Sequence, residues 1–529
     1  MGNRVAIFGG GVAGLSAAHE LVERGFQVYI YEKRPACGGK ARSLSVPDAP
    51  AKGYPGEHGF RFFPSFYRHL PDTMSRIPFG TGHVTDNLQE ATRIWVTRAG
   101  QSRIELPAKY PQSPEDWVSA LHFLLSGIGV PQDEVSFFLD RLLVLATSCQ
   151  ERRDSEYENI TWWNFIGAAT RSRAYQTLLA EGLTRSLVAM KAETGSTRSV
   201  GYILLQLLYG ILSPTGFDRL LAGPSNDVWL TPWVEYLQFR GAKIETGVDV
   251  AEFLADAQGL TGVAIRKDGA AQVVSADYYI AALPVEVMQP LVTGSLKQFV
   301  PALAGIQNIG TQWMNGIQFY LKTDVPLNHG HTLYADSPWA LTSISQNQFW
   351  TVTPLAGYGD GSIGGILSVD ISDWSAKGLN GKTAMQCAPD EIANETWAQL
   401  KQHLNVGGQL LQDANLVRYF LDPDVQFPNP PGVSFNAEPL MVNTAGSLQY
   451  RPNAPTALPN FFLASDYVRT YTDLACMEAA NEAARRAVNG ILRQAGAPEN
   501  VAVWPLAEPE IFQPMIALDR VRFQLGLPH

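Results

Sequence analysis

The stretch Val5-Ala6-Ile7-Phe8-Gly9-Gly10-Gly11-Val12-Ala13-Gly14 decides the fold of this chain. Its first four residues are apolar and predict a buried strand, and the residues from Leu15 to Arg24 follow with helical spacing. A second strand, expected over residues 27–31, ends on Glu32, about 20 residues after the glycines. Strand, GxGxxG, helix, strand and acid stand in the order of a dinucleotide-binding βαβ unit, which we therefore predict.

Each residue of the glycine motif has a physical role in such a unit. Gly9 allows the tight turn, Gly11 lets the backbone approach a pyrophosphate, and Gly14 lets the helix pack closely on the strand. The first N–H groups of the helix, at Val12 and Ala13, are expected to face the negative charge. The alternative is a glycine-rich turn that binds nothing. At this point the cofactor is open between NAD and FAD.

The residues after the second strand separate these two cofactors. Glu32 can accept hydrogen bonds from the ribose hydroxyls. It is followed by Lys33-Arg34-Pro35-Ala36-Cys37-Gly38-Gly39-Lys40-Ala41-Arg42, whose glycine pair would let the chain pass close to an extended cofactor. Lys33, Gly39 and Lys40 are candidate cofactor residues, and Arg42 can offset pyrophosphate charge. This arrangement resembles the flavin amine oxidase and phytoene desaturase superfamily, and the resemblance implies a non-covalently bound FAD. For the glycine pair alone, an ordinary turn is the alternative.

A second stretch, near the other end of the chain, resembles the superfamily's second flavin motif, Ala-Gly-Asp followed by Met-Glu-Gly-Ala. Here Ala464-Ser465-Asp466 precedes Met477-Glu478-Ala479-Ala480, so Ser465 and Ala479 replace glycines. The resemblance implies that Asp466 bonds the ribitol or pyrophosphate region and that the Met477 amide faces flavin N1 and O2. A helix N-terminus at this point would stabilise the negative charge of reduced flavin.

The middle of the chain supplies a smaller piece of the same site. Residues 241–265 alternate polar and apolar side chains and predict a small β-meander. Within it, Val250 matches the superfamily position whose backbone usually meets the adenine.

Residues 56–67, Gly-Glu-His-Gly-Phe-Arg-Phe-Phe-Pro-Ser-Phe-Tyr, resemble the plant and cyanobacterial carotenoid desaturases, with Arg61 where those enzymes have His. The aromatic residues would wall an apolar cavity beside the flavin, with Glu57, His58 and Arg61 as candidate catalytic polar groups. Alternatively, the aromatic residues belong to the core and Arg61 forms a structural ion pair.

Two residues that mark amine oxidases are missing from the chain. The Tyr that precedes the Met of the second motif is Cys476 here, and the Lys that holds a water at flavin N5 aligns with Asn315 or Gly316. Their absence favours desaturase-like C–H oxidation. The helix-spaced apolar residues between 115 and 212 predict a helical cap, either forming a substrate tunnel or serving as plain core.

Composition excludes several other classes of protein. A net charge of −10 over 529 residues gives no electrostatic footprint for nucleic acid. The four cysteines form no CxxC pair, so we expect neither a metal site nor a disulfide framework. We expect no signal peptide, and the longest apolar run, residues 200–212, is short of the roughly 20 residues of a membrane span. The expected location is cytoplasmic, with peripheral membrane contact left open.

Together these patterns predict an α/β protein with two domains. A Rossmann-like, glutathione-reductase-type FAD domain is expected from residues 1–75, 225–292 and 440–495. A substrate domain of mixed sheet and helical cap is expected from 76–224 and 293–439, and 496–529 forms an extension. The expected reaction takes hydride from a C–H bond of an apolar, isoprenoid- or polyene-like molecule, with quinone or O2 as electron acceptor. An amine or amino-acid oxidase, a double-bond isomerase and a non-enzymatic flavoprotein are the alternatives.

Overall fold

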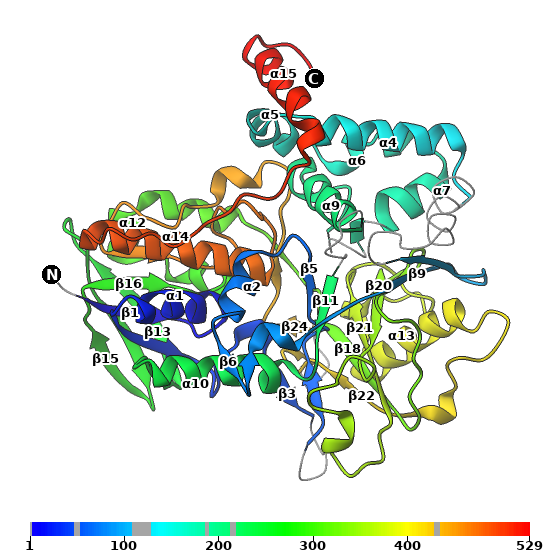
Figure 1. The fold of residues 1–529 in the computed structure, drawn as a ribbon, viewed down its shortest axis with the longest axis horizontal. Helices are drawn as coiled ribbons and strands as arrows, with labels where there is room; N and C mark the ends of the chain where they lie inside the picture. The colour runs from blue at the N-terminus through cyan, green and yellow to red at the C-terminus, as the bar shows by residue number, and fades with distance from the viewer. Residues whose placement is uncertain are drawn as a thin grey trace.

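The structure is a computed structural model of the chain, and it describes residues 3–46, 53–107, 129–182, 184–185, 190–211, 218–427 and 434–529. Two β-sheets organise these residues, one on each side of the molecule (Figure 1). The predicted α/β class with a Rossmann-like flavin domain and a second, mixed sheet is confirmed.

The first sheet is parallel and collects strands from distant parts of the chain. Its order is β12-β2-β1-β16-β26, and every neighbouring pair is parallel. The strands are β1 (Arg4–Phe8), β2 (Gln27–Glu32), β12 (Lys243–Thr246), β16 (Tyr278–Ala281) and β26 (Phe461–Leu463). Val5 to Phe8 are fully buried, as a central strand of a parallel sheet requires.

Two helices pack against each other on this sheet. Helix α1 (Val12–Glu23) follows β1, and α14 (Met477–Ala495) follows β26. Figure 1 shows them side by side, although they lie near opposite ends of the sequence. The glycine motif and the second flavin motif are therefore neighbours in space.

The predicted β-meander is confirmed as a three-stranded antiparallel sheet. It consists of β13 (Val248–Ala255), β14 (Leu260–Lys267) and β15 (Ala270–Val274). Val250 lies early in β13, close to the end of β2.

The second large sheet has seven strands in the order β10-β9-β19-β20-β21-β18-β22. The strands are β9 (Arg93–Thr97), β10 (Ile104–Pro107), β18 (Gly316–Leu321), β19 (Thr332–Tyr334), β20 (Leu341–Ser345), β21 (Gly365–Ile371) and β22 (Leu416–Leu421). All pairs are antiparallel except β9 with β19. Helix α13 (Pro389–Leu404) packs on it, with the Trp397 ring 5.1 Å from that of Phe319.

Helices α4 (Gln132–Ala146), α5 (Gln150–Ser155), α6 (Trp162–Phe165) and α9 (Thr197–Ile211) form the cap. Part of the predicted apolar pattern, Trp117, Leu121, Phe123 and Leu124, lies outside the described residues. Further along, Phe138, Leu142 and Leu145 are buried. These three residues serve as core.

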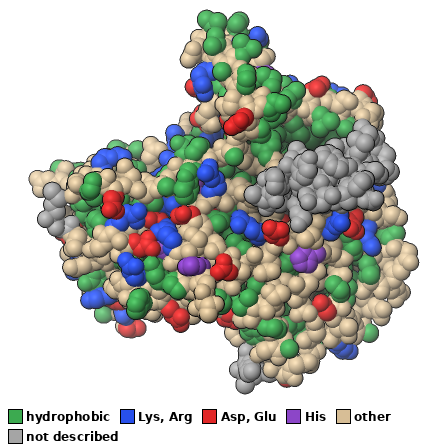
Figure 2. All heavy atoms as spheres, in the orientation of Figure 1, with side chains coloured by type: hydrophobic (Ala, Val, Ile, Leu, Met, Phe, Trp, Pro, Cys, Tyr) green, Lys and Arg blue, Asp and Glu red, His purple; other side chains and the backbone are tan. Residues whose placement is uncertain are grey.

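The C-terminal extension ends in helix α15 (Gln513–Gln524), which stands against α5 (Figure 1). Asp519 holds it there, accepting hydrogen bonds from the Cys149 N–H at 2.8 Å and from Arg152 Nε at 3.0 Å. The opposite face of α15 is apolar and exposed, with Leu518 61% and Leu525 70% accessible. Hydrophobic side chains gather on this projection in Figure 2.

All strands of the parallel sheet fall within 1–75, 225–292 and 440–495, and those of the seven-stranded sheet fall within 76–224 and 293–439. However, β11 (Asp218–Leu221) pairs with both β5 (Phe62–Pro64) and β8 (Leu88–Glu90), joining segments of the two expected domains. The domain boundaries stay a prediction. Within the described residues, no helix has the length and apolar character needed to cross a bilayer.

Candidate functional site

A cavity of about 790 Å³ lies between the parallel sheet and the seven-stranded sheet. On one side it is lined by the loop after β1, the end of β2, the glycine pair, the start of β13 and the start of α14. On the other side it is lined by residues 58–62, Met314, Asp370 of β21, and Asp424, Gln426, Ala437, Glu438 and Leu440. Its volume lies in the range of binding sites for sizeable organic ligands.

The glycine motif leaves no room for side chains. Gly9 has a φ of +105°, and a Cβ on it would lie 2.4 Å from the carbonyl oxygen of Ala282. A Cβ on Gly14 would lie 1.9 Å from the carbonyl oxygen of Gly9. Both positions therefore require glycine, because a substituted helix could not sit so close to the strand.

The acid at the end of β2 is held at the cavity by backbone groups. Glu32 Oε2 accepts a hydrogen bond from the Gly10 N–H at 2.6 Å, and Oε1 accepts one from the Arg34 N–H at 2.8 Å. Glu32, Lys33 and Val250 all line the cavity, and Lys33 Nζ lies 3.2 Å from Asp249 Oδ1. The three predicted residues are thus brought together.

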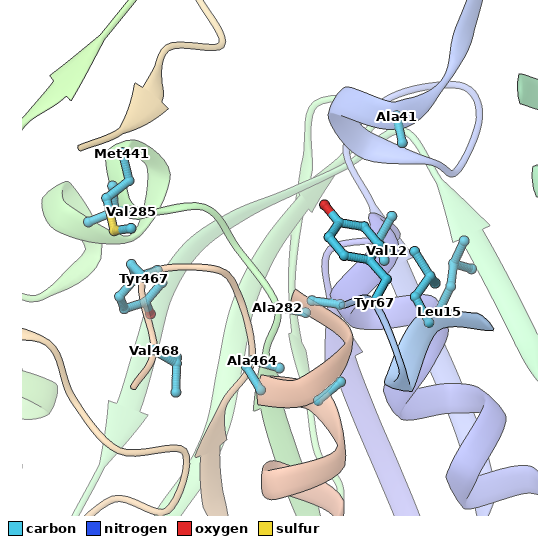
Figure 3. Packing of buried hydrophobic residues seen from close by; sticks show 14 of the residues in the cluster. Val12, Leu15, Ala41, Tyr67, Ala282, Val285, Met441, Ala464, Tyr467 and Val468 are labelled. Carbon is cyan, nitrogen blue, oxygen red and sulfur yellow. The ribbon is translucent and has the colours of Figure 1, made fainter. Parts of the chain in front are cut away.

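Two helices begin at the cavity wall. Helix α1 begins at Val12, followed by Ala13, and α14 begins at Met477; all three residues line the cavity. Asp466, just after β26, lines it as well. Small side chains such as Ala282 and Ala464 follow strands β16 and β26 at this edge (Figure 3). The N-terminal N–H groups of both helices make this region favourable for negative charge.

These features fit the cofactor that the two motifs imply. An elongated dinucleotide needs a glycine loop without side chains, a helix N-terminus for its phosphates and an acid for its ribose. The cavity supplies all three, and the start of α14 supplies a second electropositive end beyond them. Gly9, Gly11, Val12, Ala13, Glu32, Lys33, Gly39, Lys40, Val250, Asp466 and Met477 would hold FAD here, with Gly14 behind them.

Arg42 is placed differently from our expectation. Gly39 and Lys40 line the cavity, whereas Arg42 does not. Its guanidinium pairs with Asp424 at 2.8 Å and with Glu438 at 3.1 Å. Its charge is thus already neutralised by two carboxylates, which removes the reason to assign it to the pyrophosphate.

Glu57 also does not line the cavity. Its carboxylate accepts hydrogen bonds from Ser43 Oγ at 2.7 Å, from the Ser225 N–H at 2.9 Å and from Ser225 Oγ at 3.0 Å. Glu57 is 3% exposed and is not among the lining residues. A carboxylate with its hydrogen-bonding capacity filled in this way joins three segments and has little capacity left for a ligand.

His58 and Arg61 do line the cavity. His58 Nδ1 pairs with Asp422, which also accepts from Asn315 Nδ2 at 3.0 Å. Burial alone would raise the pKa of Asp422, but the hydrogen bond and charge of His58 bring it below its ordinary value. Arg61 donates to the carbonyl oxygen of Gly59 at 2.7 Å and to that of Lys40 at 2.6 Å. Both side chains are thus held in place by protein groups.

The aromatic residues of this stretch divide between the two expected roles. Phe60 and Phe62 line the cavity, whereas Phe63 is fully buried against Trp229. Tyr67 also lines the cavity beside Cys476, and burial raises the pKa of that thiol to about 12. Cys476 is therefore a neutral, weakly polar group at the start of α14.

Among the described residues of the helical cap, none lines this cavity, so the cap gives the tunnel hypothesis no support.

Several polar residues of the cavity were missed by the sequence analysis, among them Asp370, Glu286 and Glu438. Asp370, in β21, lines the cavity, and its Oδ1 is buried with no hydrogen-bond partner. Burial raises the pKa of this carboxyl from its ordinary 3.8 to about 7. No motif surrounds Asp370 in the sequence, because its position depends on the pairing of β21 with β18.

Comparisons with known proteins identify a family and several relatives of the chain. A family model described as flavin containing amine oxidoreductase matches residues 12–492. A probable zeta-carotene desaturase of Synechococcus elongatus is 27% identical over 322 residues, covering 56% of this chain and 61% of the relative. A zeta-carotene desaturase of Synechocystis sp. is 24% identical over 92% of this chain and 97% of the relative. In the first of these alignments the chain spans less than two thirds of the relative's length.

Among solved structures, a putrescine oxidase bound to putrescine has a TM-score of 0.63 at 13% identity. The match covers 93% of this chain and 99% of that one. At this identity the likeness concerns the fold.

Proposed function

The chain belongs to the family of flavin containing amine oxidoreductases, with FAD as its cofactor, and from this premise we propose that it dehydrogenates an apolar, polyene-like molecule. The reaction would remove hydride from a C–H bond, as in a carotenoid desaturase. The observation that carries the proposal is the composition of the far end of the cavity. On the side of the seven-stranded sheet, Phe60, Phe62 and Met314 give the cavity an apolar wall that also carries the polar groups of His58, Arg61 and Asp370.

Bound FAD would supply the acceptor for two electrons and one hydrogen from the substrate carbon. The protein's own part is to hold and orient the two molecules and to exclude water. The Gly9–Gly14 loop and Glu32 would position the nucleotide half, and the start of α14 would stabilise negative charge on the reduced ring. Phe60 and Phe62 would keep the substrate end of the cavity dry.

The electron acceptor is proposed to be a quinone or O2. The sequence carries one dinucleotide fingerprint, which we assign to FAD, so no second one is left for NAD(P)H. An apolar quinone would suit the same apolar surroundings as a polyene.

We further propose that α15 brings the protein to a lipid surface from which an apolar substrate is taken. Met515, Leu518, Val521 and Leu525 form one exposed stripe along the helix, while Ile516 and Asp519 are buried on the opposite face. Figure 2 shows this apolar projection standing away from the body of the molecule. An exposed apolar patch of this kind suits contact with the interface of a bilayer.

An amine oxidase is the second candidate function, favoured by the fold of the solved structures. Two observations weigh against it in this chain. The position before Met477 is Cys476, and Asn315, just before β18, and Gly316, its first residue, stand where a lysine would be expected. A double-bond isomerase and a non-enzymatic flavoprotein remain as further alternatives.

The products of turnover discriminate these functions. The purified holoprotein is supplied with a quinone and, in separate reactions, with 15-cis-phytoene, zeta-carotene, an unsaturated fatty acid and putrescine. The proposal predicts a carotene product lighter by two hydrogens. A carotene of unchanged mass with shifted absorbance would instead identify an isomerase, and turnover of putrescine alone would identify an amine oxidase.

A further inference from the structure

We propose that Asp370 is the base that takes the proton lost from the substrate while its hydride goes to the flavin. This inference rests on the proposed dehydrogenation. It adds a catalytic residue that no sequence motif identifies, from the strand β21 on the substrate side of the cavity.

The first argument is the place of the carboxyl. Asp370 lines the same cavity as Met477 and Phe60, so it can reach a molecule bound between the two sheets. Two glycines make room for it: a Cβ on Gly59 would lie 2.4 Å from Asp370 Oδ1, and a Cβ on Gly316 would lie 2.9 Å from it. The carboxyl thus occupies a space that any side chain at these two positions would fill.

The second argument is that the carboxyl keeps unused hydrogen-bonding capacity. Asp370 Oδ1 is buried with no hydrogen-bond partner, which is costly for a carboxylate and rare in folded proteins. Unsatisfied polar groups of this kind are typical of sites where a ligand completes the bonding. A proton taken from the substrate would neutralise the carboxylate and so remove the free-energy cost of its unpaired, buried oxygen.

The third argument concerns the surrounding charges. Burial is the largest influence on the pKa of this carboxyl and raises it, while the Arg61 guanidinium, the His58 and His331 rings in their protonated form, and the Phe60 N–H act in the opposite direction. Burial outweighs these groups, so that the pKa is raised to about 7. Arg61, His58 and His331 each also have an acidic partner of their own: Glu57 at 4.0 Å, Asp422 and Asp218, respectively. A base whose pKa lies near neutrality can accept a proton in the reaction and return it to water afterwards.

Other polar residues at the cavity are less suited to this role; Glu286, which also lines it, has its carboxylate 2.7 Å from Lys40 Nζ. The carboxylate oxygens of Glu57 already accept hydrogen bonds from Ser43 and Ser225. Arg61 has no acceptor, and His58 Nε2 is buried without contact to solvent. His58 Nε2 also lacks a hydrogen-bond partner, but the other ring nitrogen of His58 is paired with Asp422, whereas the Asp370 side chain has no ion-pair partner among the described residues.

The step balances as follows. One C–H bond of the substrate breaks with its electron pair going to FAD, and the C–H bond on the neighbouring carbon breaks with its proton going to Asp370. The electron pair of the second bond forms the new C=C bond. The substrate is oxidised by two electrons, FAD is reduced by two, and the carboxyl becomes neutral.

The test uses Asp370→Asn in the FAD-loaded full chain. Infrared titration of the wild type should show a buried carboxyl that loses its proton near pH 7, and this signal should be absent in Asp370→Asn. In anaerobic stopped flow with zeta-carotene in detergent, flavin reduction in the wild type should rise through pH 7 to a plateau. The variant should be slower by about 100-fold or more and lose this pH dependence.

Controls separate a chemical role from a structural one. Asp373→Asn changes a nearby buried carboxylate that is ion-paired to Arg185 at 2.7 Å, and it should keep the wild-type pH profile. FAD content and reduction by dithionite should be normal in Asp370→Asn. Added formate should restore part of the rate in Asp370→Ala, which checks the assignment if the Asn variant binds FAD poorly.

The outcomes are distinguishable. Wild-type reduction by zeta-carotene with the same rate and pH profile in Asp370→Asn would overturn the base and leave the proposed function standing. Failure of zeta-carotene and 15-cis-phytoene to reduce the wild-type flavin at any pH would overturn the proposed function, and the base assignment with it.

Discussion

Asp370 lies directly opposite Gly316 in the antiparallel ladder of β21 and β18. The missing side chain of Gly316 leaves the space into which the carboxyl fits, since a Cβ there would be 2.9 Å from Oδ1. Gly316 is also tied to the preceding loop, because its N–H donates to the carbonyl oxygen of His58 at 2.7 Å. One strand pair therefore sets the position of Asp370 and anchors the backbone of His58 on the substrate side of the cavity.

The raised pKa of Asp370 has a consequence for stability. The folded protein holds the proton up to about pH 7, whereas the unfolded chain releases it near 3.8. The native state thus binds more protons in this window, so the stability of the wild type falls as pH rises through it. The melting temperature of Asp370→Asn relative to the wild type should increase between pH 4 and pH 8, by a few degrees. A constant difference across this range would show that Asp370 titrates normally.

Gly14→Ala should abolish FAD binding. Its Cβ would lie 1.9 Å from the carbonyl oxygen of Gly9, so α1 would have to move away from β1 and the phosphate site with it. The flavin absorbance per chain after purification measures the effect. Gly357→Ala is the matched control, because a Cβ there meets nothing within 4 Å. Equal flavin content in both variants would contradict the placement of the cofactor.

Arg42 is predicted to stabilise the contact between the two sheets rather than to bind phosphate. Arg42→Ala leaves Asp424 and Glu438, both about nine-tenths buried, with Arg34 as their remaining cation. We expect a loss of about 2–4 kcal/mol in the free energy of unfolding, measured by denaturant titration.

Arg34→Ala provides the comparison for Arg42. It removes a cation from the same two carboxylates, but its side chain is 33% exposed, so solvent screens the charge. The expected loss is about 1 kcal/mol or less. A larger loss in Arg34→Ala than in Arg42→Ala would contradict this account.

Membrane contact through α15 is tested with lipid vesicles. Replacing Leu518, Val521 and Leu525 by Ser removes much of the exposed stripe while leaving Asp519 in place. Co-sedimentation with phosphatidylglycerol-containing vesicles should fall by about tenfold or more, because each apolar side chain contributes about 1.5–3 kcal/mol when fully buried. Leu379→Ser changes a leucine that is 50% exposed elsewhere and should leave sedimentation unchanged.

The sequence was informative wherever a function depends on local spacing. Gly9, Gly14 and Glu32 lie within one βαβ unit, so their arrangement follows from the order of strand, turn and helix. The start of α14 at Met477 was predictable for the same reason, since a strand, a loop and a helix follow each other there.

The sequence was uninformative where a residue's role depends on a distant partner. Arg42 was assigned to the pyrophosphate because the acids that neutralise it, Asp424 and Glu438, lie far along the chain. Glu57 was assigned to the cavity because Ser225, which occupies its carboxylate, comes from another segment. Asp370 was missed because its position depends on the register of β21 against β18.

The central claim is that a polyene reduces the flavin held between the two ends of the chain. Anaerobic mixing of the FAD-loaded protein with one equivalent of zeta-carotene tests it most directly. The account predicts that the flavin absorbance is bleached and that the recovered carotene has lost two hydrogens. A flavin that stays oxidised with zeta-carotene and 15-cis-phytoene, but is bleached by putrescine, would contradict it.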